Sequence, residues 1–538
     1  MNINKVCAAF SALCLTGTAV LAANINSKLT SVSAVSELLG DANRNGVVDG
    51  VDATIILSYY AYISAGHDNI SVDDYVKMRT NEEPAQTTTA PQTTEPPVTT
   101  TTVSNSNIKL KSGGDTFTIA VWNMDDLPRL VGKWLNVTED EVSESYYSQT
   151  ESYDPIDNHP LITLKTPTGS KLRIINMGLG GSEAAEKIDT LLLSGDDLDV
   201  YYCEPVWAKH FIDNDSLTAP LSDLGFTDKD FAQTYKYADD IGHNKDGVRK
   251  GASPFISPGG FAYRSDLADE YLGIKSPAEM QSAIGSWDKF ISTAQKLSER
   301  SNGNTALADT LGGMYQAYTM SHRMTDADRN ITADAKEFAD YAKTLWECGG
   351  VTKNSQWSDE WLADGLKGRT MGYFIPTWGI RGFLGHASEE SRAKWELVQG
   401  PESFYWGGIM TVVNPATDNA ADCASFIRSS CLYKESMLAA AENDMYDLPN
   451  NKEAMAEIIK TPSLSDISSA KEFRTYDYFS VLNDAAEEIS FTPYSYPNQS
   501  NVEYYMVNTI RDKYIKAGSS WEETETTFKT SNYWSLIK

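Results

Sequence analysis

Apolar and polar positions alternate in the large C-terminal part of the chain in a way that predicts an α/β sheet. Apolar runs at 117–122, 171–178 and 197–204 have the length and composition of buried strands. A helical pattern at 183–195 separates the second run from the third, and Ser182 is its expected N-cap. Strands and a helix in this order are typical of α/β domains.

Helical patterns dominate the rest of this part, and one apolar strand at 372–380 lies among them. The stretch 243–247, HNKDG, is interpreted as a hairpin turn. We therefore expect residues 108–538 to form one large α/β unit. The longest helical patterns cover 286–300, 331–349, 358–368 and 501–518.

Oxygen-bearing residues recur on alternate positions after Gly40, near the start of the chain. Ca²⁺ takes carboxylate, amide and backbone carbonyl oxygens at positions 1, 3, 5, 7, 9 and 12 of an EF-hand loop, with glycine at position 6. Gly46 occupies that turn position here, and a polar turn without an ion is the alternative. The predicted metal ligands are Asp41, Asn43, Asn45, Val47 (through its backbone carbonyl), Asp49 and Asp52.

The last ligand position of this loop holds Asp52 instead of the usual glutamate, and a helical pattern at 51–64 overlaps it directly. This combination resembles the dockerin repeat of cellulosome and amylosome proteins, particularly the ruminococcal type. A second repeat is degenerate, because 70–78 carries no glycine turn and no alternating ligands. The resemblance implies a small all-α, EF-hand-like module at 28–80 that holds one Ca²⁺. It also implies a cohesin-bearing scaffold or surface protein as partner.

Composition marks two segments that flank this module. At residues 1–22, Lys5 precedes an apolar run that ends in small residues, which is typical of a secretory signal peptide. Residues 84–107 are rich in threonine and proline and lack aromatic residues, so we expect an extended linker. The sequence therefore predicts a secreted protein, extracellular or attached to a cell surface by docking, that does not span a membrane.

Charge and cysteines exclude several classes of function. The formal net charge of −29 argues against nucleic acid or an anionic membrane as a partner. The cysteines beyond the signal peptide form no C-x-x-C pair, which argues against a zinc or thioredoxin-like site. Disulfides and buried free thiols both remain open for them. These four residues are Cys203, Cys348, Cys423 and Cys431.

The large unit resembles the extracellular solute-binding proteins (family 1 type) of carbohydrate ABC importers. The resemblance covers essentially all of 108–538. It implies two α/β lobes joined by crossing strands, with a sugar bound between them. Lobe one would take about 108–250 plus part of the C-terminal region, and lobe two about 265–405. The segments that carry it are KIDTLLLSGD and DLDVYYCEPVW, PLSDLGF, PGGFAYRSDLADEYLG, GRTMGYFIPTWG and YWGGIMTVVNPATDNAADCASFI.

A sugar site needs aromatic faces for pyranose rings and a few fixed polar groups for hydroxyls. We expect both at strand ends, where ligands collect in open α/β sheets. For each tryptophan the alternative is core packing, and for Glu204 it is a structural carboxylate. Glycines flank Trp378 and Trp406, which we placed at strand ends, and favour a binding role for them. The candidate ligand-binding residues are Trp122, Asp125, Asp126, Glu204, Trp207, Tyr263, Tyr315, Trp378 and Trp406.

The sequence thus favours a non-enzymatic oligosaccharide receptor, tethered through its calcium module. It would serve transport, with an ABC permease as a further partner, or a surface polysaccharide-degrading complex. The alternative is a dockerin-borne glycoside hydrolase, which needs two carboxylates across the scissile bond. No hydrolase, nucleophile-elbow, dinucleotide or zinc-protease motif is present, so we assign no catalytic residue.

Overall fold

The computed structural model describes residues 109–148, 161–356, 358–383, 394–441, 448–461, 478–496, 499–531 and 534. All of them belong to one compact unit, Thr100–Lys538. The predicted signal peptide, calcium loop and linker lie outside the described residues, and so do both halves of the dockerin-like repeat. Among the described residues, no helix is both long and apolar enough to cross a membrane.

Lobe one is built on a six-stranded sheet with the order β2-β3-β1-β4-β12-β5. β1 is parallel to β3 and β4, whereas β12 returns antiparallel to β4 and β5. The central strands β1 and β4 are almost wholly buried, as expected for strands covered by helices on both faces, whereas β3 is partly exposed. The strands are β1 (Thr116–Val121), β2 (Leu161–Lys165), β3 (Lys171–Asn176), β4 (Val200–Cys203), β5 (Gly251–Ala252) and β12 (Met410–Val413).

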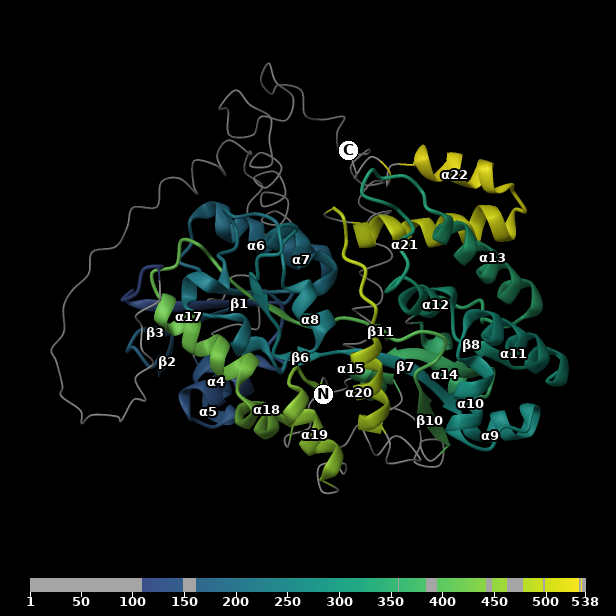
Figure 1. Cartoon of the computed structure of the whole chain (residues 1–538), viewed down its shortest axis with the longest axis horizontal. Helices are drawn as coiled ribbons and strands as arrows, with labels where there is room; N and C mark the ends of the chain where they lie inside the picture. The colour runs from purple at the N-terminus through teal and green to yellow at the C-terminus, as the bar shows by residue number, and fades with distance from the viewer. Residues whose placement is uncertain are drawn as a thin grey trace, which may run out of the picture. The chain divides into compact units, whose positions relative to one another are not determined.

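Helices cover both faces of this sheet. Figure 1 shows α6 and α7 on one side of β1, with α4 and α5 on the other. Two short 3₁₀ segments, Leu221–Leu224 and Asp228–Phe231, and a π-helical turn, Arg428–Leu432, complete the lobe. The helices are α4 (Leu127–Leu135), α5 (Glu139–Tyr147), α6 (Gly181–Ser194), α7 (Pro205–Ile212), α8 (Lys236–Ile241), α17 (Ala420–Ile427), α18 (Lys434–Ala441) and α19 (Lys452–Lys460).

Lobe two is built on a second sheet with the order β10-β7-β9-β8, and β11 also pairs with β7. Gly372 of β9 lets the strands pack closely, because a Cβ there would lie 2.4 Å from the Phe261 ring of β7. The strands are β7 (Pro258–Arg264), β8 (Ala306–Ala308), β9 (Thr370–Pro376), β10 (Trp395–Val398) and β11 (Phe404–Tyr405). The helices are α9 (Ser265–Leu267), α10 (Pro277–Ile284), α11 (Trp287–Arg300), α12 (Leu311–Tyr318), α13 (Ala333–Cys348), α14 (Asp359–Leu366) and α15 (Thr377–Phe383), with a π-helical turn at Ala268–Leu272.

The C-terminal region divides between the lobes. Residues 410–441 and 448–461 pack with lobe one, whereas α20 (Tyr478–Glu488) lies against β7 of lobe two. α21 (Gln499–Thr509) continues into a π-helical turn, Ile510–Lys516, that packs on α13, and α22 (Trp521–Lys529) follows. In Figure 1 these last helices lie beside α13.

Two described segments connect the lobes, and they run next to each other. The first leads from β5 through β6 (Phe255–Ile256) into β7, and β6 pairs with β13 (Leu448–Pro449). The second leads from β11 to β12. Neighbouring connecting segments of this kind allow two packed lobes to rotate about a hinge.

The observed elements confirm most of the predicted ones, with corrections at their ends. α6 begins at Gly181 after the extended Gly180, so Ser182 lies inside the helix and is not its N-cap. The predicted strand 372–380 ends at Pro376, and Trp378 lies in the first turn of α15 instead of at a strand end. The predicted turn at 243–247 is confirmed by an antiparallel bridge between His243 and Arg249.

All four described cysteines are free thiols, and three of them are buried. Burial raises the pKa of the Cys203 and Cys423 thiols well above the usual range. They therefore behave as small apolar core residues.

Candidate functional site

The candidate site begins at the carboxyl ends of β1 and β4, which are neighbours and parallel. Trp122 follows β1 and is half-buried. Glu204 follows β4 and precedes Pro205, the first residue of α7. The Trp122 ring meets the edges of Tyr202 at 6.0 Å and of Trp207 at 6.2 Å between ring centroids. Trp122, Tyr202, Glu204 and Trp207 thus share one edge of the sheet.

Glu204 is the carboxylate at the centre of this edge. Loss of solvent raises its pKa, and the nearby Trp207 indole partly offsets that increase. Trp207 is 7% exposed and packs on Phe211, so it is both a core residue and the neighbour of Glu204. A carboxylate held this way can accept hydrogen bonds from ligand hydroxyls beside an aromatic face.

Asp125 and Asp126 lie beyond the end of β1. The Asp125 carboxylate accepts a hydrogen bond from the Asn123 side chain at 2.9 Å, and partial desolvation raises its pKa. Asp126 is half-buried and forms an ion pair with Arg129 at 2.7 Å. Asp125 therefore offers the more accessible carboxylate, and Asp126 orients the start of α4.

Lobe two contributes a pair of tryptophans. Trp378 and Trp406 meet edge to face with ring centroids 5.5 Å apart, and Trp378 Nε1 donates a hydrogen bond to the Trp406 carbonyl at 2.7 Å. Gly407 has φ of 81°, and a Cβ there would lie 2.9 Å from Trp378 Nε1. The glycine is therefore required for the close approach of the two rings.

The next residue brings the two lobes together. A Cβ on Gly408 would lie 3.6 Å from Cγ of Pro205, the residue that follows Glu204. The loop that carries Trp406 therefore passes directly beside the start of α7. The structure thus brings the segment that carries Glu204 and Trp207 next to the loop that carries Trp406, although these segments are far apart in the sequence.

Three buried polar residues that the sequence analysis missed lie behind this junction. The Tyr405 ring is 1% exposed and stacks on Tyr237 with centroids 5.2 Å apart. Its hydroxyl has no hydrogen-bond partner among the described residues, and it lies in the electrostatic environment of Glu204, Tyr494 and Arg323. The Arg323 guanidinium stacks 4.1 Å above the Tyr494 ring. The YW pair at 405–406 and the closely spaced tyrosines at 494 and 496 are the sequence features that could have indicated them.

Tyr315 lies next to this cluster, on α12. It is buried, and its hydroxyl donates a hydrogen bond to the Ser500 carbonyl at 3.2 Å. Its ring meets Tyr504, which is 42% exposed on α21, with centroids 5.9 Å apart. Tyr504 is the more exposed aromatic face, and the sequence analysis did not select it.

Tyr263 lies apart from the other candidates, which corrects its placement in a crossing segment. It sits near the far end of β7, which pairs with neighbours on both sides inside lobe two. The side chain is buried, and its hydroxyl donates to Glu396 on β10 at 3.4 Å. The crossing strand ends before Pro258, so Tyr263 is a core residue of the second sheet.

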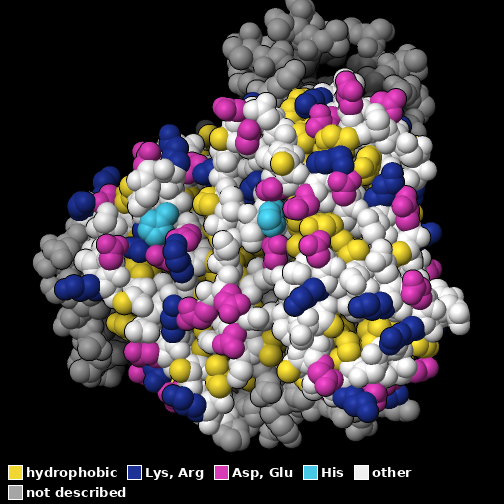
Figure 2. All heavy atoms as spheres, turned by 45° about the vertical axis from the view of Figure 1, so that its right-hand side comes forward, with side chains coloured by type: hydrophobic (Ala, Val, Ile, Leu, Met, Phe, Trp, Pro, Cys, Tyr) yellow, Lys and Arg dark blue, Asp and Glu magenta, His cyan; other side chains and the backbone are white. Residues whose placement is uncertain are grey.

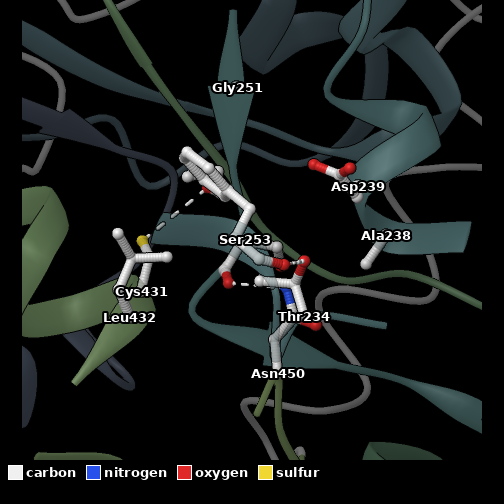
Figure 3. Close-up of a pocket in the computed structure, with 10 residues that line it drawn as sticks. Thr234, Ala238, Asp239, Gly251, Ser253, Cys431, Leu432 and Asn450 are labelled. Atoms are coloured by element: carbon white, nitrogen blue, oxygen red, sulfur yellow. Dashed lines mark hydrogen bonds between the residues drawn. The ribbon is translucent and has the colours of Figure 1, made fainter. Parts of the chain in front are cut away.

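A small cavity lies in lobe one, away from the predicted site residues. Its volume of about 10 Å³ leaves room for about one water molecule. Figure 3 shows Ser253, Asn450 and Thr234 around it, with the Cys431 thiol on the opposite wall. Space of this size fits a structural water and no sugar.

One acidic group is a candidate for a cation. Carboxylate oxygens of Asp197, Asp199 and Asp418 lie within 4.8 Å of one another. The buried Asp199, however, already accepts hydrogen bonds from the Thr118 amide and the Thr417 hydroxyl, and burial raises its pKa to about 6. The group precedes β4 at its amino end, the opposite end from Glu204.

Charged side chains of both signs are mixed on the face shown in Figure 2, where the right-hand side of Figure 1 comes forward. In Figure 2, Lys and Arg side chains alternate with Asp and Glu over that face. A mixed surface of this kind does not favour a highly charged polymer as ligand.

Comparison with known proteins gives both a family match and a fold. Residues 165–366 match the model of the family described as bacterial extracellular solute-binding protein. The structure resembles that of an extracellular solute-binding protein of family 1, with a TM-score of 0.59 and 16% identity over 77% of this chain and 97% of that chain. No curated protein matches the chain by sequence.

Two further structures are informative. The sugar-binding protein MalE from the phytopathogen Xanthomonas citri has a TM-score of 0.57 and 15% identity, over 78% of this chain and 97% of that one. The galacto-N-biose-/lacto-N-biose I-binding protein of the ABC transporter from Bifidobacterium longum has a TM-score of 0.53 and 13% identity, over 74% of this chain and 92% of that one. Residues 165–366 therefore resemble a bacterial extracellular solute-binding protein, and the described part of the chain has the two-lobed fold of the solved structures that it resembles.

Proposed function

We propose that this protein is a non-enzymatic receptor that captures an oligosaccharide between its two lobes. The observation that carries the proposal is that the loop that carries Trp406, which contacts Trp378, passes beside Pro205, the residue after the half-buried carboxylate Glu204. Trp122 and Trp207 come from lobe one, and Trp378 and Trp406 come from lobe two. Aromatic faces cover the apolar faces of sugar rings, while the carboxylate fixes hydroxyls.

The structural neighbours support a sugar as the ligand class. The Xanthomonas citri neighbour is described as sugar-binding, and the Bifidobacterium longum neighbour was solved with lacto-N-biose. Binding would draw the lobes together about the crossing strands, and the ligand would favour the closed state in proportion to its differential affinity.

The finer part of the proposal concerns delivery. The spacing of oxygen ligands from Asp41 to Asp52 supports a Ca²⁺ site in a dockerin-like module, with a cohesin-type partner. The Thr/Pro-rich segment 84–107 would let a tethered receptor reach its ligand. The secreted receptor would then serve an ABC permease or a surface polysaccharide-degrading complex.

The test is thermal unfolding of the whole protein against a panel of oligosaccharides, with product analysis of the same samples. A sugar at 100 times its dissociation constant stabilises the native state by about 2.7 kcal/mol. We expect Trp378→Ala to weaken binding by roughly tenfold, because one stacking face is lost. Trp346→Ala is the matched control, since Trp346 is also half-buried but lies on α13.

Three results would contradict the proposal. The first is the absence of a shift with every sugar. The second is an equal loss of affinity in both tryptophan variants. The third is release of shorter sugars, which would instead favour a hydrolase.

A further inference from the structure

The first turn of α21 is in contact with both lobes. Ser500 Oγ donates a hydrogen bond to the backbone carbonyl of Val206 at 3.1 Å, and Val206 is the second residue of α7 in lobe one. The Ser500 carbonyl accepts a hydrogen bond from the Tyr315 hydroxyl of α12, in lobe two, at 3.2 Å. One residue therefore spans the junction.

The lobe two side of this connection is rigidly held. Gln499 Nε2 donates to the Thr325 carbonyl at 2.7 Å, and the buried Glu503 carboxylate accepts from the Thr325 amide at 3.0 Å. Glu503 also lies 3.9 Å from the Arg323 guanidinium, and both side chains are less than a tenth exposed. A buried charge pair is costly to disrupt, so the start of α21 moves with lobe two.

On the lobe one side, the connection is the hydrogen bond from Ser500 to Val206, next to the candidate sugar site. Val206 lies between Glu204 and Trp207 in sequence, at the amino end of α7. This end faces the edge of the sheet where ligands collect in open α/β folds. Rotation of the lobes away from each other would separate Val206 from Ser500 before it disturbed the packing inside either lobe.

We infer that Ser500 is a closure latch: its hydroxyl holds α7 only when the lobes have closed, and it slows release of the bound sugar. The inference rests on the proposed sugar-receptor function. Ser500 is a positioning residue, because it contacts the α7 backbone and not the ligand. The latch also holds the Val206 carbonyl, and with it the turn that presents Glu204 and Trp207.

A contact made only after closure affects dissociation and not capture. A typical hydrogen bond between neutral groups changes an equilibrium by about two- to tenfold. We therefore expect Ser500→Ala to increase the sugar dissociation rate by that factor and to leave the association rate unchanged. Ser500→Thr retains a hydroxyl and should restore slow release.

The measurement is stopped-flow tryptophan fluorescence of the whole protein with the sugar that gives the largest thermal shift. Ser430→Ala serves as the matched control, because its hydroxyl also donates to a backbone carbonyl, that of Phe426 at 2.7 Å, but within lobe one. The unliganded unfolding temperature of each variant is measured in parallel.

Each outcome has a separate meaning. Faster release in Ser500→Ala alone, with an unchanged unliganded unfolding temperature, supports the latch. An unchanged release rate overturns it, and so does an equal effect in Ser430→Ala. A lower unliganded unfolding temperature in Ser500→Ala also overturns it, because the contact would then exist without ligand. If the unsubstituted protein responds to no sugar, the receptor function itself fails.

Discussion

His322 is surrounded by acidic groups in lobe two, near the loop that leads to the candidate site. Its Nε2 lies 3.0 Å from Glu402 Oε1, which also accepts a hydrogen bond from the Trp287 indole at 2.8 Å. Asp334 Oδ2 lies 3.6 Å from its Nδ1, and the ring stacks on Tyr318. The hydrogen bond to Glu402, with the charges of Asp334 and Glu337, raises the pKa of His322.

This environment predicts a pH-dependent stability. Because the folded pKa is above the usual 6.5, stabilisation is complete below 6.5 and is lost as pH rises through the folded value. We expect His322→Gln to lower the unfolding temperature more at pH 5.5 than at pH 8.5, as measured by calorimetry. Glu402→Gln should remove the same pH-dependent part of the stability. Parallel pH profiles for the unsubstituted protein and His322→Gln would contradict the assignment.

At the scale of the elements, lobe two depends on the close packing of β7 and β9. Both strands are fully buried, so their side chains face packed layers on each side of the sheet. Gly372 lies under the Phe261 ring, where any side chain would collide. Apolar patterning predicted the strand in this region, but no local pattern indicated which aromatic ring would cover the glycine.

We therefore expect Gly372→Ala to destabilise lobe two by roughly 1–3 kcal/mol, since overpacking a core forces neighbours to shift. Denaturant unfolding of the two proteins measures the difference. Gly180→Ser is the control, because a Cβ at Gly180 meets no atom within 4 Å and serine suits the N-cap of α6. An unchanged denaturant midpoint for Gly372→Ala would contradict this prediction, because the strands would then accommodate the added methyl group without cost.

At the scale of the whole molecule, metal binding and sugar binding are assigned to different parts of the chain. The proposed Ca²⁺ ligands lie between Asp41 and Asp52, whereas the candidate sugar residues begin at Trp122. The segment 84–107 between them has the composition of an extended spacer, so we expect the two proposed functions to be independent.

We expect equilibrium dialysis to find one tightly bound Ca²⁺ per chain, and Asp41→Ala to lose it without changing sugar affinity. Loss of one carboxylate from a site of few charges weakens Ca²⁺ strongly. Asp418→Asn is the control, because Asp418 belongs to the acidic group in lobe one. Retention of the ion in Asp41→Ala, or its loss in Asp418→Asn, would show that the calcium site lies outside the loop at 41–52.

The sequence by itself determined the features that depend on near neighbours along the chain. The strands that end at Val121 and Cys203, and the helix Trp287–Arg300, follow from periodicity within a few residues, whereas the predicted cap at Ser182 was wrong. The likeness to solute-binding proteins was evident at this level too, because the order of the elements carries it.

Only the tertiary structure decided which side chains share a site. Trp406 lies beside the start of α7 because two crossing strands bring distant segments together, and the same strands leave Tyr263 in the core of lobe two. Tyr405 and Ser500 gained their roles from partners about 170 to 300 residues away, namely Tyr237 and Val206. Contacts at such separations depend on how whole elements pack, and no local pattern in the chain records that packing.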